Sequence, residues 1–277
     1  MNIRSTLALV VLTVTPAFAQ LAPFNDAGVT LGHIHLLVKD VDAQKRFWTA
    51  MMGGTPVMNE QLAMIQFPGV YILFRQGDPT APPAGSIVDH FGLVFKDLPA
   101  SLAKWRANGI EIEQNQNPLQ GYVHAPDGVR VEFFGDPSLD APVKMDHVHF
   151  WPVDTPAIQA WYARAFGGKP GQRPRVSTPG WIDCDFFPGA NFSFSPQEKK
   201  PTPTAGRSLD HIGFEVKNLD ATLKRLEGQG IRIDEGPRPS PNSKRLRVAY
   251  VTDPWGTRIE LTEGLSPNSK GLAPNSR

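Results

Sequence analysis

One short motif occurs four times in this chain of 277 residues, and it constrains the fold more than any other feature. Each copy begins with a histidine and reaches an Asp or Asn seven residues later. Repetition of one pattern indicates a supersecondary unit that buries its apolar face against its neighbours. The chain is therefore predicted to contain four copies of one module. The copies run from His33 to Asp40, His90 to Asp97, His147 to Asp154 and His211 to Asn218.

Alternation within each copy predicts a β-strand whose histidine and apolar residues lie on opposite faces. In the first copy His33 and His35 share one face, opposite three aliphatic side chains. The Asp or Asn that ends each copy is a favoured helix N-cap, and an apolar stripe with a terminal glycine follows it. Short β-segments come next, and those at 122–132 and 250–260 are hairpins with Pro-x-Gly turns. Each module is therefore predicted to have the order β-α-β-β-β.

Four modules of this kind predict an α+β fold in which they pair into two domains. Pairing in sequence order places the first domain at residues 31–136 and the second at 145–263. Pro-rich joints separate the modules within each domain. Residues 264–277 are polar and are expected to form a disordered tail.

Each predicted domain carries two histidines and one glutamate on the faces of its strands that lie opposite the apolar residues. Alternation in the two hairpins places Glu132 and Glu260 on these faces. Two neutral imidazoles and one carboxylate, with open positions beside them, suit Fe(II) and are compatible with Mn(II) or Zn(II). The expected ligand sets are His33, His90 and Glu132 in the first domain, and His147, His211 and Glu260 in the second.

Three further histidines leave alternatives open. His35 and His149 lie two residues beyond His33 and His147 and face the same way, so either could replace its neighbour as a ligand. Otherwise they are candidates for proton transfer or for hydrogen bonding near the metal, because histidine titrates close to neutral pH. His124, in the first hairpin, is a candidate for the same roles.

These features together resemble the vicinal oxygen chelate superfamily, which includes glyoxalase I, bleomycin and fosfomycin resistance proteins and the extradiol ring-cleaving dioxygenases. The resemblance covers about residues 31–263 and rests on the histidine strands with their capped helices and on the hairpins. It also rests on Phe47-Trp48 and Trp161-Tyr162, each followed by Gly-Gly. It implies paired modules that curl into an open cup around a divalent metal, with ligands from the strands named above.

The resemblance also implies catalytic residues. In the extradiol enzymes a tyrosine ten residues before the ligand glutamate hydrogen-bonds the substrate, and Tyr250 and Tyr122 match that position. The last strands of the odd modules contain no acidic ligand of the glyoxalase kind, which favours the three-ligand pattern of the dioxygenases. Two further histidines of the ring-cleaving enzymes are not matched, since Pro241-Asn242-Ser243 and Phe194-Ser195 stand at their places.

The expected function is that of a metal-dependent dioxygenase, with Fe(II) favoured, acting on a small oxygenated molecule, for which a phenol is a candidate. A metal-dependent lyase or isomerase of the glyoxalase kind is the nearest alternative. A non-catalytic binding protein of the resistance kind is the other. The Pro-rich approach to the second hairpin, residues 235–244, is longer than its counterpart in the first. A longer loop can close over substrate, so the second domain is expected to be the working half.

The N-terminus indicates export. Residues 1–19 combine a positive head, a short apolar stretch and the small residues Ala17 and Ala19 of a cleavage site, which is typical of a secretory signal. We expect a periplasmic or secreted protein, without a membrane anchor after cleavage, in which Cys184, the single cysteine, is buried. The 28 basic and 27 acidic residues nearly balance, which argues against nucleic acid as a partner. The expected partner is a small-molecule substrate, and a homo-oligomer is compatible with the sequence.

Overall fold

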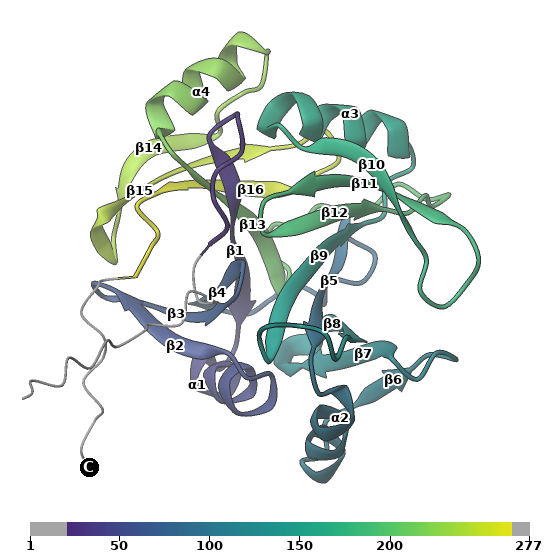
Figure 1. Ribbon diagram of the computed structural model, residues 1–277. Coiled ribbons are helices and arrows are strands. Elements are labelled where there is room, and N and C mark those ends of the chain that lie inside the picture. The colour runs from purple at the N-terminus through teal and green to yellow at the C-terminus, as the bar shows by residue number, and fades with distance from the viewer. Residues whose placement is uncertain (1–20, 268–277) are drawn as a thin grey trace, which may run out of the picture.

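The computed structural model describes residues 21–267 and contains the predicted module four times (Figure 1). The first module consists of β1 (Val29–Val38), α1 (Val41–Arg46), the π-helical turn η2 (Phe47–Met51), β2 (Thr55–Asn59), β3 (Leu62–Phe67) and β4 (Val70–Gln76). The second consists of β5 (Val88–Phe95), α2 (Leu98–Ala107), β6 (Ile112–Gln114), β7 (Gln120–Ala125), the 3₁₀ turn η3 (Pro126–Gly128) and β8 (Val129–Gly135). The third consists of β9 (Val143–Phe150), α3 (Thr155–Phe166), β10 (Lys169–Pro174), β11 (Trp181–Phe187) and β12 (Ala190–Phe194). The fourth consists of β13 (Leu209–Val216), α4 (Leu219–Gly228), β14 (Glu235–Ser240), β15 (Ser243–Thr252) and β16 (Arg258–Glu263).

The four α-helices begin where the motif predicts. In each module the side chain of the Asp or Asn accepts a hydrogen bond from the backbone N–H of an alanine three residues later, at 2.8 to 3.0 Å. This bond satisfies one of the N–H groups that a helix leaves unpaired at its start. The capping residue therefore converts the end of each first strand into a helix start.

The strands form two eight-stranded sheets, and each sheet combines two modules. The sheet that we call the 1/4 sheet has the order β14-β15-β16-β13-β1-β4-β3-β2. The 2/3 sheet has the order β10-β11-β12-β9-β5-β8-β7-β6. At the centres of the two sheets, β1 pairs antiparallel with β13 and β5 pairs antiparallel with β9.

This pairing corrects the expected domain organisation. Modules 1 and 4 share one sheet and modules 2 and 3 share the other, so each sheet draws on both predicted domains, 31–136 and 145–263. Only residues 136–142 connect β8 to β9, and this short link keeps modules 2 and 3 together. All four first strands carry the same motif, so the motif itself does not select a partner.

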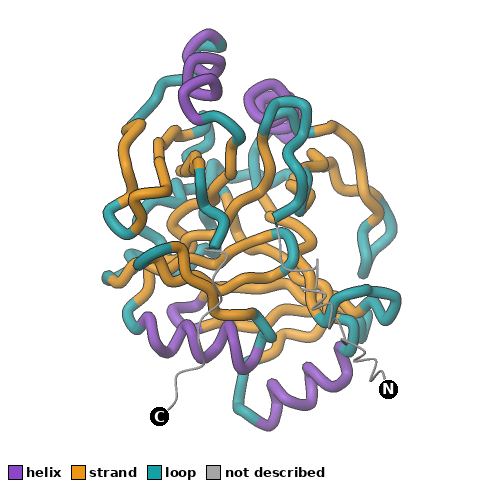
Figure 2. Tube along the Cα trace, turned by 60° about the vertical axis from the view of Figure 1, so that its left-hand side comes forward, coloured by secondary structure: helices purple, strands orange, loops and turns teal. Residues whose placement is uncertain are grey.

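A continuous apolar core lies on the helix-packing faces of both sheets. Trp48 of the first module and Trp105 of the second are completely buried in it. The indole N–H of Trp105 donates to the carbonyl of Met51 at 2.9 Å and so links α2 to η2. Figure 2 shows the helices at two opposite ends of the molecule, with strands between them. The core thus leaves the opposite face of each sheet for the histidines.

The structure tests the predictions for the two ends of the chain only in part. The predicted signal at 1–19 lies outside them, as does most of the predicted tail at 264–277. The first tail residues do not behave as expected, because Leu265 is completely buried against the 1/4 sheet. Cys184 is a buried free thiol, as predicted. Within 21–267, no helix has the length and apolar character needed to cross a membrane.

Candidate metal centres

Each sheet brings four potential metal ligands together on the face opposite the apolar core. Within each group the ligand atoms lie within 4.8 Å of one another. The 1/4 site consists of His33, His35, His211 and Glu260. The 2/3 site consists of His90, Glu132, His147 and His149.

All six predicted primary ligands are in these groups, but the predicted sets are wrong. His33 and His147 have exchanged places relative to the expectation, because module 1 pairs with module 4 rather than with module 2. The 2/3 site therefore combines one module from each predicted domain. A working half made of residues 145–263 alone is not compatible with this arrangement.

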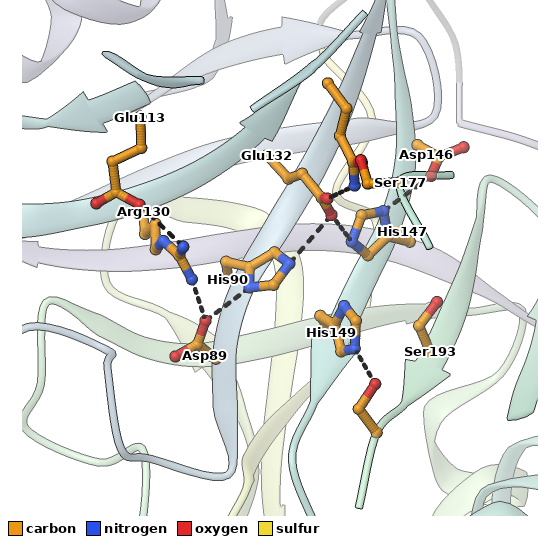
Figure 3. Close-up of polar contacts among 12 residues, drawn as sticks. Asp89, His90, Glu113, Arg130, Glu132, Asp146, His147, His149, Ser177 and Ser193 are labelled. Carbon is orange, nitrogen blue, oxygen red and sulfur yellow. Dashed lines mark hydrogen bonds and ion pairs between the residues drawn. The ribbon is translucent and has the colours of Figure 1, made fainter. Parts of the chain in front are cut away.

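In the 2/3 site two histidines point at the same carboxylate oxygen (Figure 3). Nε2 of His90 lies 3.2 Å from Oε2 of Glu132, and Nε2 of His147 lies 3.1 Å from the same atom. On the other side of each ring, Nδ1 of His90 bonds Asp89 at 2.7 Å and Nδ1 of His147 bonds Asp146 at 2.8 Å. A carboxylate at Nδ1 favours the tautomer that carries its proton there, which leaves the Nε2 lone pair free to bind a metal.

This donor set fits a divalent cation. Lone pairs on two neutral imidazoles and a carboxylate repel one another at these distances unless a cation or a proton lies between them. His90 and His147 are completely buried and Glu132 is nearly so, so water cannot relieve the repulsion. Burial opposes ionisation of Glu132, but the imidazoles of His147 and His90 that face it outweigh this effect and hold the pKa of Glu132 well below its usual range. An ionised carboxylate and two imidazoles are the ligands that a transition metal requires.

Two glycines make room for the ligand rings. Gly92 pairs in register with His147, and a Cβ atom at position 92 would lie 2.3 Å from Cε1 of that imidazole. Gly213 pairs with His33, and a Cβ atom there would lie 2.0 Å from the ring. Sequence reasoning missed both glycines, although each follows a motif histidine by two residues.

The 1/4 site repeats this geometry with different support. Nε2 of His33 and Nε2 of His211 each lie 2.9 Å from Oε2 of Glu260. Nδ1 of His211 bonds Asp210 at 2.6 Å, whereas Nδ1 of His33 is buried without a hydrogen-bond partner among residues 21–267. Gly32 stands before His33 where the 2/3 site has an aspartate before His147. Only one of the two histidines in the 1/4 site is therefore oriented by a carboxylate.

The alternative histidines lie farther from the carboxylates or have other partners. Nδ1 of His35 is 3.8 Å from Glu260, and burial lowers the pKa of His35 to about 4. His149 shares a hydrogen bond of 2.9 Å with the hydroxyl of Ser195 and stacks on Trp151. These positions leave His33 and His147 as the nearer ligands of each pair. His124 lies outside both groups, with its Nε2 2.6 Å from Glu113.

The two tyrosines named by the resemblance lie beside the ligands. The hydroxyl of Tyr250 donates to Oε1 of Glu260 at 2.9 Å. The ring of Tyr122 contacts His90 edge to face, with 5.2 Å between ring centroids. Burial raises the pKa of both hydroxyls, so each stays protonated at neutral pH and can donate a hydrogen bond.

Surroundings distinguish the two sites more than ligands do. In the 1/4 sheet, the strand face that carries His33 and His35 also carries Tyr71 and Leu73 in register. These side chains belong to a buried apolar cluster that flanks the ligands. Its buried members are Met64, Tyr71, Leu73, Leu246, Val248 and Leu265.

In the 2/3 sheet the positions that correspond to Tyr71 and Leu73 are polar, and a pocket adjoins the ligand face. Asn191 and Ser193 stand in register with His147 and His149. A pocket of about 350 Å³ lies beside Asp146, the partner of His147. Its lining consists of Val94, Asn117, Leu119, Phe134, Gly135, Asp136, Asp146, Arg173 and Val176.

Two loops border this pocket, and neither is the one that was expected to close over substrate. Residues 235–244, expected as a long approach, form β14, its turn and the start of β15. In the 2/3 sheet the loops 115–119 and 175–180 meet instead, where Asn117 donates to the carbonyl of Val176 at 3.4 Å. In the same place the hydroxyl of Ser177 bonds Gln120, whose amide donates to Oε1 of Glu132.

Several supporting residues were therefore missed in the sequence, and one signal could have found some of them. An aspartate directly precedes three of the four motif histidines, which is a visible Asp-His dipeptide. Gln120 carries no such signal, because its role depends on the pairing of β7 with β8.

Comparisons with known proteins agree with this architecture. Residues 144–261 match the model of the Glyoxalase/Bleomycin resistance protein/Dioxygenase superfamily. Among solved structures, glyoxalase I from Zea mays superposes with a TM-score of 0.64 at 16% identity, over 85% of this chain and 92% of that chain. A putative dioxygenase from Bacillus subtilis gives a TM-score of 0.58 at 11% identity, over 86% of each chain. No curated protein matches this sequence. At these identities the structures are evidence for the fold alone.

Proposed function

We propose that the chain is a divalent-metal enzyme of the vicinal oxygen chelate superfamily, and that its working site is the 2/3 site. The observation that carries this proposal is the contrast between the two sheets. His90, His147 and Glu132 converge next to a pocket, whereas an apolar cluster that includes Tyr71, Leu73 and Leu265 flanks the ligands of the 1/4 sheet. A substrate needs such space beside the metal ligands.

Two histidines and one carboxylate favour Fe(II), and a dioxygenase reaction is the proposed chemistry. A bound ferrous ion would supply sites for O₂ and for neighbouring oxygen atoms of a small substrate. The chain's own groups would orient that substrate and move its protons. Tyr122 has a protonated hydroxyl next to His90 and can donate a hydrogen bond.

His149 is the proposed proton acceptor. Burial, together with the nearby His90 and His147, lowers its pKa well below the usual value, so the imidazole is neutral at pH 7. Its Nδ1 is buried without a hydrogen-bond partner among the described residues, while Nε2 is held by Ser195. A neutral imidazole with one nitrogen fixed and one available can accept a proton from a substrate hydroxyl.

The 1/4 site is proposed to hold a metal without turning over substrate. Its ligands repeat those of the 2/3 site, but Tyr71 and Leu73, in register with His33 and His35, are apolar where the 2/3 sheet has polar side chains. A metal held there would stabilise the sheet that joins the first and last modules.

Matched glutamine variants test this division of roles. Glu132→Gln and Glu260→Gln each keep the shape of the side chain and remove one ligand charge. We expect each variant to lose one of two bound metal ions, measured by elemental analysis of protein loaded anaerobically with Fe(II). Only Glu132→Gln should abolish O₂ consumption with a panel of small phenols and diols. Absence of metal from the wild-type protein, or loss of turnover only in Glu260→Gln, would refute the proposal.

We also propose that the protein is exported, on the evidence of residues 1–19. Mass spectrometry of the protein from the periplasm and the medium of an expressing bacterium tests this. A mature chain that begins at Gln20 is expected, and an uncleaved cytoplasmic chain would contradict it.

A further inference from the structure

The pocket beside the 2/3 site has one basic side chain in an otherwise largely apolar wall. Arg173, on β10, lines it together with Phe134, Val94, Leu119 and Val176. Leu119 and Val176 are 47% and 42% exposed, which is unusual for large aliphatic side chains at adjoining positions. Exposed apolar groups around a cavity indicate a surface that a ligand covers.

Arg173 is held in place by the sheet. Its Nε donates to the hydroxyl of Ser193 at 2.9 Å, and that hydroxyl in turn donates to Asn191 at 2.7 Å. The side chain of Arg173 also interacts with the thiol of Cys184 and with the charge of Asp146. No salt bridge within 4.0 Å joins its terminal nitrogens to a carboxylate among residues 21–267, and a guanidinium edge matches a carboxylate with two parallel bonds.

Each acidic residue of the same pocket has a hydrogen-bond partner through one of its oxygens. Asp146 bonds Nδ1 of His147 at 2.8 Å. Asp136 accepts bonds from the backbone N–H and the hydroxyl of Ser138, at 2.9 and 2.6 Å. Arg173 is the one cationic side chain among the residues that line the pocket.

In the 1/4 sheet, the position equivalent to this pocket is covered by the chain segment at Gly264 and Leu265. Strand register equates Val94 and Phe134 with Glu215 and Thr262. Glu215 accepts the backbone N–H groups of Gly264 and Leu265 at 2.8 and 3.2 Å, which turns the Leu265 side chain into the sheet. In the 2/3 sheet the residue equivalent to Glu215 is Val94, which cannot accept such hydrogen bonds. Val94 lines the pocket instead.

We propose that this pocket binds the carboxylate of a small organic acid through Arg173, with the apolar body of the acid against Phe134, Leu119 and Val176. Phe134 also contacts the ring of His147, with 5.8 Å between centroids, so the bound acid lies next to the ligand set. A pocket of about 350 Å³ accommodates a molecule of single-ring size. This inference rests on the proposed function and narrows its substrate class to carboxylate-bearing molecules.

Titration with a matched pair of probes tests the proposal. Benzoate and benzamide have the same ring and differ in charge, and calorimetry on the full chain loaded with Zn(II) avoids redox chemistry. We expect benzoate to bind at least tenfold more tightly than benzamide to the wild type. Arg173→Gln should remove that preference, and Arg175→Gln, an exposed arginine two residues farther on, should retain it.

The Glu132→Gln variant separates this inference from the metal proposal. If Arg173 binds the carboxylate, the preference for benzoate persists in Glu132→Gln even after the 2/3 metal is lost. A preference that survives in Arg173→Gln but disappears in Glu132→Gln would mean that the carboxylate binds the metal, which overturns the role of Arg173. Equal binding of both probes to the wild type would overturn it as well, while metal content and O₂ consumption would still test the proposed function.

Discussion

At the scale of single residues, two glycines determine where the ligand imidazoles can lie. The ring of His147 occupies the space that a side chain at Gly92 would need, and His33 has the same relation to Gly213. The alternation of the strands predicts which histidines face the ligand side. It does not predict this contact, which is made across two strands that are far apart in the sequence.

Gly92→Ala should therefore remove the metal of the 2/3 site. The new methyl group would overlap the ring of His147 and push its Nε2 away from Glu132. We expect the metal content to fall from two ions to one, measured by elemental analysis. Gly228→Ala is the control, because nothing lies within 4 Å of a Cβ atom there, and its metal content should match the wild type. Two ions in Gly92→Ala would show that the ring can shift without losing the metal.

At the scale of strands and loops, the pairing of modules could not be predicted. The first strands of the odd modules carry His-x-His, and those of the even modules carry His-x-Gly. In each observed pair, a histidine of the odd strand stands opposite the glycine of the even strand. That rule allows module 1 to pair with either module 2 or module 4. The choice depends on connection lengths and on the shared core, which no strand motif encodes. This is why all six ligands could be identified while their grouping could not.

The loop 175–180 is connected to the 2/3 site through Gln120. The amide of Gln120 holds Oε1 of Glu132, and Ser177 holds the amide oxygen of Gln120. Gln120 stands two residues before Tyr122, and Val248 of β15 stands two residues before Tyr250. The variant Gln120→Val therefore introduces the residue of the equivalent position and removes this support. Metal affinity of the 2/3 site should fall by roughly 10 to 100-fold, as is usual when a group that orients a ligand is lost.

Competition with a chelator measures this change. Ser177→Ala should have a smaller effect than Gln120→Val, because it keeps the bond between Gln120 and Glu132 intact. An unchanged affinity in Gln120→Val would show that the two histidines alone fix the position of Glu132.

At the scale of the whole molecule, one buried acid should make stability depend on pH. Asp185 lies under α3 with both carboxylate oxygens buried and without a partner among the described residues. Burial raises its pKa to about 7, from an ordinary value of 3.8. The folded state therefore holds a proton that the unfolded state releases between these values. The contribution of Asp185 to the free energy of unfolding is fully present below about pH 4. It decreases as the pH rises and is lost above about pH 7.

Asp185→Asn should remove this contribution. In urea unfolding of metal-saturated protein between pH 4 and 8, the free energy of unfolding of the wild type should fall more steeply with pH than that of the variant. The difference in slope corresponds to at most one proton, or about 1.4 kcal/mol per pH unit. Equal slopes would mean that Asp185 is ionised in the folded protein.

The placement of modules 2 and 3 inside the sequence, between the two halves of the 1/4 sheet, has a consequence for synthesis. Residues 88–194 contain every strand of the 2/3 sheet, so that sheet can assemble while the ribosome is still translating the rest. β1 must wait for β13, and until then its backbone presents an open edge to other chains. A product that ends before β13 would thus contain every ligand of the 2/3 site, while one edge of β1 would remain without its partner strand.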